Sequence, residues 1–202
     1  MIAVIDYGVG NLFSLTSSLA AIGADSVVTD DPSVIAKADK IILPGVGAFS
    51  DAKKKLADKG LDKVIISEVN AGKKIFGICL GMQMLFEKSF EYGEHEGLGL
   101  LRGSVVAMDG VIPKELKIPH IGWNALHIKK QHQIFKYVKE NDYVYFVHSF
   151  YAENCDESLL ASCEYGKELT AAVALDNISG TQFHPEKSGE VGLSILRAFA
   201  EW

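Results

Sequence analysis

The sequence predicts an α/β fold: an open, mostly parallel sheet flanked by helices, followed by a β-rich second half. The first half alternates short β-rich runs with longer helical patterns, which is typical of βαβ units. Beyond Phe86 the pattern changes to strand pairs separated by turn residues. The 202 residues, 48% hydrophobic and 23% charged, are compatible with one hydrophobic core, so we expect a single domain over residues 1–202.

The first strand and its crossover helix have the clearest signals. The apolar run Ile2–Ile5 predicts a strand, and Asn11–Ile22 carries apolar residues at helical spacing. Gly23 follows where helices commonly end on glycine, because glycine adopts the left-handed conformation without a Cβ clash. Residues 2–23 therefore predict one βα unit.

The same alternation continues up to residue 86. Asp31 and Pro32 are typical of the N-cap and the first residue of a helix. In chain order we expect a strand at Val27–Thr29, a helix from Asp31, a strand at Ile41–Leu43, a loop at Pro44–Phe49, a helical stretch at Asp51–Asn70, a strand at Lys74–Ile78 and a helix at Leu80–Phe86.

The second half is predicted to consist mainly of strands. Asp109 and Gly110 have the residue types of a type I′ hairpin turn. The expected elements are strands at Leu100–Met108 and Ile121–Ile128, a short helix at Gln131–Val138, strands at Tyr143–Tyr151, Leu159–Glu164 and Ala171–Leu175, and a closing helix at Glu190–Trp202.

The charge of the chain argues against nucleic acid and membrane surfaces as partners. A formal net charge of -6 and a pI near 5.5 would repel phosphate backbones and anionic lipid, and no Lys/Arg cluster offsets this locally. Met1–Asp6 lacks the basic segment and cleavage site of a signal peptide. No apolar stretch approaches the roughly 20 residues of a membrane-spanning helix. Together with an odd number of widely spaced cysteines, these features predict a cytoplasmic protein.

The segment Gly77–Gly81 has the pattern of a nucleophile elbow, with Cys79 at its centre between a buried strand and a helix. A nucleophile on a tight, strained turn needs neighbours without Cβ. The start of the helix at Leu80 also favours the thiolate form of Cys79. The alternative is a buried structural cysteine beside two glycines that pack against a helix.

His184 and Glu186 supply the base and the orienting carboxylate that a cysteine hydrolase requires. Pro185 restricts His184 to extended backbone, so the two side chains are expected on the same side of the chain. Glu186 would fix the imidazole tautomer and leave the other ring nitrogen to exchange a proton with Cys79 and the leaving group. The alternative for this His-Pro-Glu string is a surface turn.

The loop Pro44–Gly47 follows a strand end, on the side of an open α/β sheet where ligands bind. Its two glycines leave it free to aim backbone N–H groups. We expect an oxyanion hole made by the N–H groups of Val46 and Leu80. A tight turn between strand and helix is the alternative.

These motifs give the chain a resemblance to the triad-type class I glutamine amidotransferases over its whole length, which implies their flavodoxin-like fold. The strings are P-G-V-G-A-F at Pro44–Phe49, G-I-C-L-G-M-Q at Gly77–Gln83 and Q-F-H-P-E-K-S at Gln182–Ser188. Two more, D-Y-G-V-G-N at Asp6–Asn11 and P-H-I-G-W-N at Pro119–Asn124, resemble the branch that forms the glutaminase subunit of imidazole glycerol phosphate synthase.

The resemblance implies a role for each motif. Cys79, His184 and Glu186 would form a catalytic triad that hydrolyses glutamine to glutamate and ammonia through a glutamyl thioester. Phe150 departs from the tyrosine that the family often has, which matters little if recognition is through the main chain. The positions implied as contacts to glutamine are Gly45, Gln83 and the backbone of His148, Ser149 and Phe150.

A partner subunit is implied as well. Ammonia becomes mostly ammonium in water at neutral pH, so it needs a protected path to an acceptor site, for which this chain has no spare length. In the resembled branch the acceptor is a separate (β/α)8-barrel cyclase subunit. It forms a heterodimer with the glutaminase, activates it, and makes imidazole glycerol phosphate and an aminoimidazole carboxamide ribotide in histidine biosynthesis. The implied contacts with that subunit are Asn11, Trp123 and Lys187.

We expect neither a metal nor a cofactor. His95, His127 and His132 share no ligand spacing with cysteine or acidic residues. The pair of glycines at positions 8 and 10 resembles a dinucleotide-binding fingerprint, but Phe13 occupies the position of its third glycine.

Three further residues of reactive type have structural interpretations. His148 lies in an aromatic and β-branched strand, where a hydrogen-bonded core histidine is expected. Cys155 and Cys163 have no base in their sequence neighbourhood and are expected to be packing residues.

Two other functions remain open at the level of sequence. One is a paralogous glutaminase that supplies ammonia to another amidation pathway, such as sugar-nucleotide modification. A neighbouring gene for a barrel cyclase, or a histidine requirement in a knockout, would distinguish it. The other is a non-catalytic flavodoxin-like binding module. Release of glutamate from glutamine in the presence of a synthase would exclude it.

Overall fold

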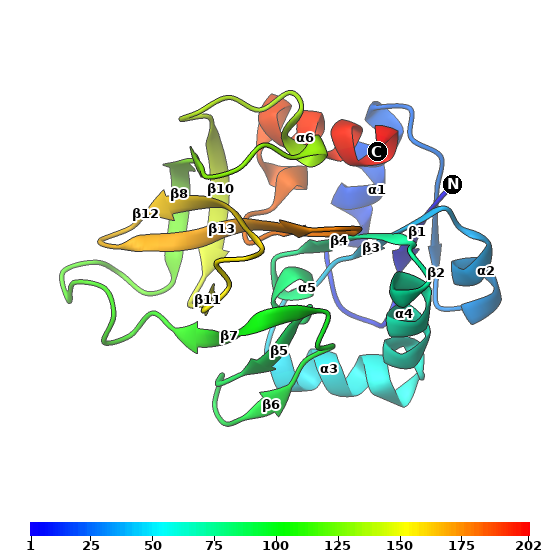
Figure 1. The fold of residues 1–202 in the computed structure, drawn as a ribbon, viewed down its shortest axis with the longest axis horizontal. Coiled ribbons are helices and arrows are strands. Elements are labelled where there is room, and N and C mark those ends of the chain that lie inside the picture. The colour runs from blue at the N-terminus through cyan, green and yellow to red at the C-terminus, as the bar shows by residue number, and fades with distance from the viewer.

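An eight-stranded sheet forms the centre of the computed structural model, which describes residues 1–202 (Figure 1). Its strands are β1 (Ile2–Ile5), β2 (Ser26–Thr29), β3 (Lys40–Leu43), β4 (Lys74–Ile78), β9 (His127–Ile128), β12 (Leu159–Glu164), β13 (Glu168–Leu175) and β14 (Ile178–Thr181). They lie in the order β2-β1-β3-β4-β14-β13-β12-β9. The strands from β2 to β14 pair in parallel, and those from β14 to β9 pair antiparallel. The expected open, mostly parallel sheet is confirmed.

Two smaller sheets account for the β-rich second half. One has four strands in the order β11-β7-β5-β6, and the other pairs β8 with β10 in an antiparallel hairpin-like ladder. The bounds of these strands are β5 (Phe86–Ser89), β6 (His95–Glu96), β7 (Leu101–Ala107), β8 (His120–Ala125), β10 (Tyr143–His148) and β11 (Phe150–Glu153).

Helices cover both faces of the large sheet (Figure 1). Helices α1 (Leu12–Ala21) and α6 (Gly189–Glu201) pack on one face, and α2 (Pro32–Lys37), α3 (Phe49–Asp58) and α4 (Leu61–Asn70) pack on the other. The remaining helices are the short α5 (Leu80–Gln83) and two 3₁₀ helices, η1 (Gln133–Phe135) and η2 (Pro185–Lys187). No helix is long and apolar enough to cross a membrane.

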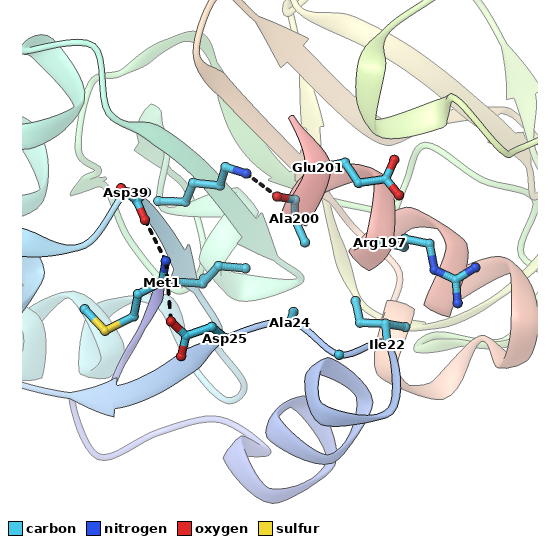
Figure 2. Close-up of a pocket in the computed structure, with 11 residues that line it drawn as sticks. Met1, Ile22, Ala24, Asp25, Asp39, Arg197, Ala200 and Glu201 are labelled. Carbon is cyan, nitrogen blue, oxygen red and sulfur yellow. Dashed lines mark hydrogen bonds and ion pairs between the residues drawn. The ribbon is translucent and has the colours of Figure 1, made fainter.

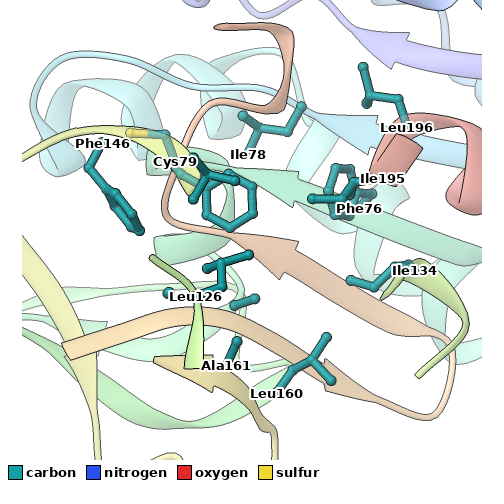
Figure 3. Packing of buried hydrophobic residues seen from close by; sticks show 14 of the residues in the cluster. Phe76, Ile78, Cys79, Leu126, Ile134, Phe146, Leu160, Ala161, Ile195 and Leu196 are labelled. Atoms are coloured by element: carbon teal, nitrogen blue, oxygen red, sulfur yellow. The ribbon is translucent and has the colours of Figure 1, made fainter. Parts of the chain in front are cut away.

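The core consists of two clusters, one on each face of the sheet, because the parallel strands are buried on both sides. In β4, Phe76 and Ile78 face the cluster under α1 and α6, while Ile75 faces the opposite one. Cys79 lies at one end of the first cluster, near Phe146 (Figure 3). Each buried aliphatic or aromatic side chain contributes about 1.5–3 kcal/mol, so burial on both faces anchors the end of β4 in the core.

The sequence signals for the first crossover helix are confirmed. The Asn11 side chain caps α1 by accepting from Ser14 N at 3.4 Å, and Gly23 follows the helix with φ of 73°. Asp31 caps α2 by accepting from Ser33 N at 2.7 Å, with proline as the first helical residue.

Two helix predictions in the first half are wrong at their boundaries. The stretch Asp51–Asn70 is two helices, since Gly60 adopts a left-handed conformation with φ of 69° between α3 and α4. The helix predicted at Leu80–Phe86 ends at Gln83, because Phe86 already pairs with Leu101 in the second sheet.

Three predictions in the second half are also wrong. Asp109 and Gly110 do not form a type I′ hairpin: only Gly110 has the positive φ that both turn residues need, and β7 and β8 belong to different sheets. The strand Ile121–Ile128 is interrupted at Leu126 between β8 and β9. The strand Tyr143–Tyr151 is interrupted at Ser149, where the chain passes from one small sheet to the other.

Several elements of the structure were not predicted correctly from the sequence pattern. Strand β14 carries Gly180 and polar residues, yet it pairs in parallel with β4 and ends beside Ile78. The short strands β5 and β6 were not predicted, and the helix expected at Gln131–Val138 is only the 3₁₀ turn η1. The carboxyl ends of β3, β4 and β14 thus meet at one edge of the sheet, where an open α/β fold places its ligand site.

Candidate active site

Cys79 lies on the turn between β4 and α5 with φ of 54° and ψ of −111°, an unfavourable conformation for a residue with a Cβ. Its glycine neighbours have no room for a side chain. A Cβ at Gly77 would lie 2.7 Å from Met82 Cα, and one at Gly81 would lie 1.8 Å from Leu43 O. Close packing therefore holds the strained turn, as an elbow requires. Helix α5 has only four residues, so its dipole contributes less than the sequence pattern suggested.

His184 and Glu186 meet directly, but not through the extended geometry expected from the sequence. Nδ1 of His184 lies 2.8 Å from Oε1 of Glu186, and the side chains are 3% and 4% exposed. His184 is extended, with φ of −95° and ψ of 101°, while Pro185–Lys187 forms the 3₁₀ turn η2 and brings Glu186 back to the ring. Because Nδ1 donates to the carboxylate, Nε2 is left free for Cys79.

The charge state of His184 follows from its two neighbours. Burial disfavours its protonated form, but hydrogen bonds and charge from Cys79 and Glu186 outweigh burial and raise the pKa of His184 to about 10. The ring is therefore protonated at neutral pH. The proton on this ring is available to a leaving group at Cys79. Gln182 Nε2, 3.6 Å from Cys79 Sγ, adds a second donor to that sulfur.

A cavity of about 380 Å³ opens over Cys79, a size that accommodates a small metabolite. It collects residues from the elbow, the loop after β3, the crossing between β10 and β11, and η2. The residues that line it are Val46, Gly47, Cys79, Leu80, Gln83, Glu91, Tyr92, Pro119, Val147, His148, Ser149, Phe150, His184 and Lys187.

Gln83 and the crossing segment form one hydrogen-bonded wall of this cavity. Nε2 of Gln83 donates to Phe150 O at 3.1 Å and to Oε1 of Gln182 at 2.9 Å. At the interruption of the predicted strand, Ser149 O accepts from Met108 N at 3.0 Å, and His148, Ser149 and Phe150 line the cavity. The structure therefore brings together the segment His148–Phe150 and Gln83, as the sequence suggested.

His148 has the environment of a hydrogen-bonded core histidine. Its Nδ1 lies 2.8 Å from Phe150 O, and its Nε2 lies 3.1 Å from Nδ1 of His120. Burial is the main cause that lowers the pKa of His148 to about 3, so the ring is neutral at neutral pH. His148 is thus a neutral ring whose two nitrogens both have hydrogen-bond partners, as expected of a core histidine.

The structure places both expected oxyanion residues at the cavity but not Gly45, which was expected to contact glutamine. Val46, 41% exposed, and Leu80 both line the cavity. Gly45 does not line it and is buried below the loop. A Cβ at Gly45 would lie 2.8 Å from both Gly81 N and Tyr7 Oη, so close packing explains the glycine.

The expected partner contacts also differ in their surroundings. Lys187 lines the Cys79 cavity, and Trp123 on β8 is 52% exposed with an edge-on contact to Tyr145. Asn11 caps α1 and lines a separate small cavity next to Glu186. This hydrogen bond explains an asparagine at position 11 without any contact to a partner subunit.

Glu91 and Tyr92 line the cavity and were not anticipated from the sequence. The Glu91 carboxylate accepts a hydrogen bond from Phe49 N at 2.6 Å, and partial burial raises its pKa. Tyr92 is 89% exposed, has φ of 54° and packs edge-on against Phe150. Both follow the unpredicted strand β5, whose pairing with β7 brings this segment to the cavity.

A second cavity of about 520 Å³ lies at the amino ends of β1 and β3, away from Cys79 (Figure 2). Met1, Asp25 and Asp39 gather on one side of it, and Arg197 projects from α6 on the other. None of the residues predicted to take part in catalysis, glutamine binding or partner contact lines it. No group of three or more His, Cys, Asp or Glu side chains in the chain is arranged to hold a metal ion.

The sequence model of the family described as "Glutamine amidotransferase class-I" matches residues 3–201. The chain belongs to this family. Among its relatives, a protein of Oceanobacillus iheyensis named imidazole glycerol phosphate synthase subunit HisH is 50% identical over 202 residues, covering 100% of this chain and 98% of the relative. A protein of Aquifex aeolicus with the same name is 49% identical over 198 residues, covering 97% and 94%.

Solved amidotransferase structures have the same fold at much lower sequence identity. A crystal structure described as a glutamine amidotransferase aligns with a TM-score of 0.77 and 17% identity over 100% of both chains. The structure of PurLQS from Thermotoga maritima aligns with a TM-score of 0.73 and 22% identity, covering 99% of this chain and 97% of the other. These likenesses confirm the fold class expected for an amidotransferase.

Proposed function

We propose that this chain is the glutaminase subunit of an imidazole glycerol phosphate synthase. It hydrolyses glutamine to glutamate and ammonia and delivers the ammonia to a separate subunit. The observation that carries the proposal is Cys79 on a strained elbow, in one cavity with a His184 that is hydrogen-bonded to Glu186. Relatives named imidazole glycerol phosphate synthase subunit HisH, 50% and 49% identical over the whole chain, support the choice of pathway.

The proposed chemistry begins with the Cys79 thiolate, which attacks the side-chain amide carbon of glutamine. The negative charge moves to the amide oxygen, which accepts hydrogen bonds from the N–H groups of Val46 and Leu80. His184 then donates its Nε2 proton to the departing nitrogen, so that ammonia leaves and a glutamyl thioester remains. Neutral His184 next takes a proton from water, which opens the thioester and releases glutamate and the thiolate. Glu186 holds the ring orientation throughout.

Substrate recognition is assigned to the hydrogen-bonded wall of the cavity that Gln83 and residues 148–150 form. Gln83 and the backbone of residues 148–150 surround the head group of glutamine. Glutamine also carries an α-ammonium. Glu91 is the one carboxylate in the cavity lining, and it accepts a hydrogen bond from the neutral Phe49 N–H. We assign Glu91 to that ammonium, because partial desolvation strengthens a charge-assisted hydrogen bond there.

The acceptor for ammonia is proposed to be a (β/α)8-barrel cyclase subunit. The exposed face of the β8–β10 pair offers an apolar surface next to the cavity, since Ile121, Trp123 and Tyr143 are 58%, 52% and 57% exposed. Large exposed aromatic and aliphatic side chains in one patch are typical of protein interfaces. Lys187, in the cavity lining, adds a positive charge at its rim.

The decisive experiment is reconstitution with the cyclase subunit encoded in the same genome. The complex should release glutamate from glutamine and form imidazole glycerol phosphate with either glutamine or ammonium salts. Cys79→Ala should abolish only the glutamine-dependent reaction. Cys155→Ala is the matched control, because Cys155 is buried outside the cavity, bonded to Thr170, and burial raises its pKa. Substantial glutaminase activity in Cys79→Ala would contradict the mechanism.

The choice of pathway has its own test. A strain that lacks this gene should require histidine, and Cys79→Ala should fail to relieve that requirement at low ammonium. Growth of the deletion strain without histidine would instead assign the chain to a different amidation pathway.

A further inference from the structure

Tyr7 is a buried residue that the proposed chemistry does not use. It follows β1, is 1% exposed, and its hydroxyl donates a hydrogen bond of 2.7 Å to Pro44 O. That oxygen belongs to the peptide between Pro44 and Gly45, and the next peptide carries the N–H of Val46. The hydroxyl therefore fixes the peptide that immediately precedes the proposed oxyanion donor.

The same segment is confined from the opposite side by the elbow. Leu43 O lies so close to Gly81 that a Cβ there would be 1.8 Å away. A Cβ on Gly45 would lie 2.8 Å from Gly81 N, 2.8 Å from Tyr7 Oη and 3.0 Å from Leu80 Cβ. Gly45 thus lies between the Tyr7 hydroxyl and the start of α5, and the two proposed oxyanion donors, Val46 and Leu80, flank this contact.

The Tyr7 hydroxyl is suited to a permanent donor role. Burial is the main cause that raises the pKa of Tyr7, with a smaller contribution from the charge of Cys79. The phenol therefore keeps its proton at every pH at which the enzyme works. A buried tyrosine usually finds some hydrogen-bond partner. Here the partner is a carbonyl at the base of the catalytic loop.

We propose that Tyr7 is a positioning residue for the oxyanion hole, whose hydroxyl holds the Pro44–Gly45 peptide so that the Val46 N–H points at the reacting carbonyl oxygen. The inference rests on the proposed function. Displacing the Val46 N–H would raise the energy chiefly of the states in which that oxygen carries negative charge, the tetrahedral intermediate and the transition states around it. Binding of uncharged ground-state glutamine depends on other groups.

The test is Tyr7→Phe, which removes one oxygen and keeps the ring in the core. In the complex with the synthase subunit, kcat for glutamine hydrolysis should fall about tenfold, less than the roughly 10²–10³ lost when a donor is removed outright. The KM for glutamine should stay within about twofold. Binding of glutamine to the inactive Cys79→Ala protein should be equally unaffected by the added Tyr7→Phe change.

Alkylation of Cys79 by iodoacetamide separates positioning from general damage. The reaction needs the thiolate but forms no tetrahedral oxyanion, so its rate should be the same in Tyr7→Phe and the unaltered protein. A parallel fall in the alkylation rate and kcat would show that the substitution disorders the elbow, and would overturn the proposal. A rise in KM at constant kcat would also overturn it.

The matched control is Tyr137→Phe, which removes a hydroxyl with an equally short bond, 2.7 Å to Glu201 Oε2, on the surface near α6. It should leave kcat unchanged. If the unaltered complex fails to hydrolyse glutamine, the proposed function itself fails. An active complex in which Tyr7→Phe has unaltered kcat overturns only the role of Tyr7.

Discussion

His184 and Glu186 share a buried hydrogen bond of 2.8 Å, while the second oxygen of the carboxylate, Oε2, is buried with no partner. A carboxylate with one unsatisfied oxygen is costly in a dry environment unless a positive charge lies next to it. The protonated ring of His184 supplies that charge. The pair is thus mutually dependent: Glu186 keeps the imidazole charged and oriented, and the imidazole makes the buried carboxylate tolerable.

Glu186→Gln should lower kcat for glutamine hydrolysis by about 10- to 100-fold, because a neutral amide no longer stabilises the imidazolium. The loss should be smaller than in Cys79→Ala, since a cysteine nucleophile needs less help from its base than a serine would. The measurement is steady-state glutamate release in the complex. Glu190→Gln, at the exposed start of α6, is the control. Unchanged turnover in Glu186→Gln would remove Glu186 from the orienting role.

The pKa values of the two cavity histidines should be shifted in opposite directions from the usual 6.5. The pKa of His184 is raised to about 10 and that of His148 is lowered to about 3, so at pH 7 the first ring is charged and the second is neutral. NMR of labelled histidines should show this directly. Since the folded-state pKa of His184 lies above its usual 6.5, its contribution to stability is complete below pH 6.5 and is lost as pH rises towards 10. Replacing His184 by Asn should flatten the fall in unfolding free energy over that window.

The elements that the sequence predicted best are those with local signals. The cap at Asp31 and the left-handed Gly23 are decided within a few residues, so their pattern is sufficient. Strand β14 has no such signal. Its Ser179 and Gly180 suit a central position only because β4 and Met82 lie against them, and a Cβ at Gly180 would lie 2.7 Å from Met82 Cγ.

The same distinction holds for the candidate site. Cys79, His184 and the loop at Pro44–Gly47 lie in motifs whose residue types reveal their chemistry. Glu91 lies in no motif, and its place in the cavity depends on the pairing of β5 with β7, which no periodicity indicates. The turn η2 gave the expected His184–Glu186 contact by a different route, because the proline fixes its own φ and the residue before it but leaves the following residue free to turn.

Glu91→Gln should raise the KM for glutamine by about tenfold with little change in kcat, because it removes a charge that contacts the substrate equally in the ground state and the transition state. Glu94→Gln is a matched control three residues further along the same loop, since the Glu94 side chain is 62% exposed, pairs with Lys88 and does not line the cavity. Glutamine binding to the Cys79→Ala background gives the affinity directly. A fall in kcat without a change in affinity would contradict the assignment of Glu91.

Trp123 and Lys187 should couple the partner subunit to the glutaminase site. Trp123 presents a half-exposed ring on β8, and Lys187 reaches the cavity from η2, one residue after Glu186. A docked subunit that contacts both would press on the two walls that enclose Cys79. Burial of such an aromatic and charged pair is typical of an interface hot spot.

Trp123→Ala or Lys187→Ala should therefore lower the partner-stimulated glutaminase rate by about 3- to 10-fold, while the ammonium-dependent synthase rate in the same complex stays within about twofold. Both rates are measured at saturating partner, so that a change in complex formation does not contribute. Lys54→Ala, an exposed lysine on α3 at the opposite face of the sheet, is the control and should change neither rate. An equal fall in both reactions, or no change in either, would show that these residues do not transmit docking to the nucleophile.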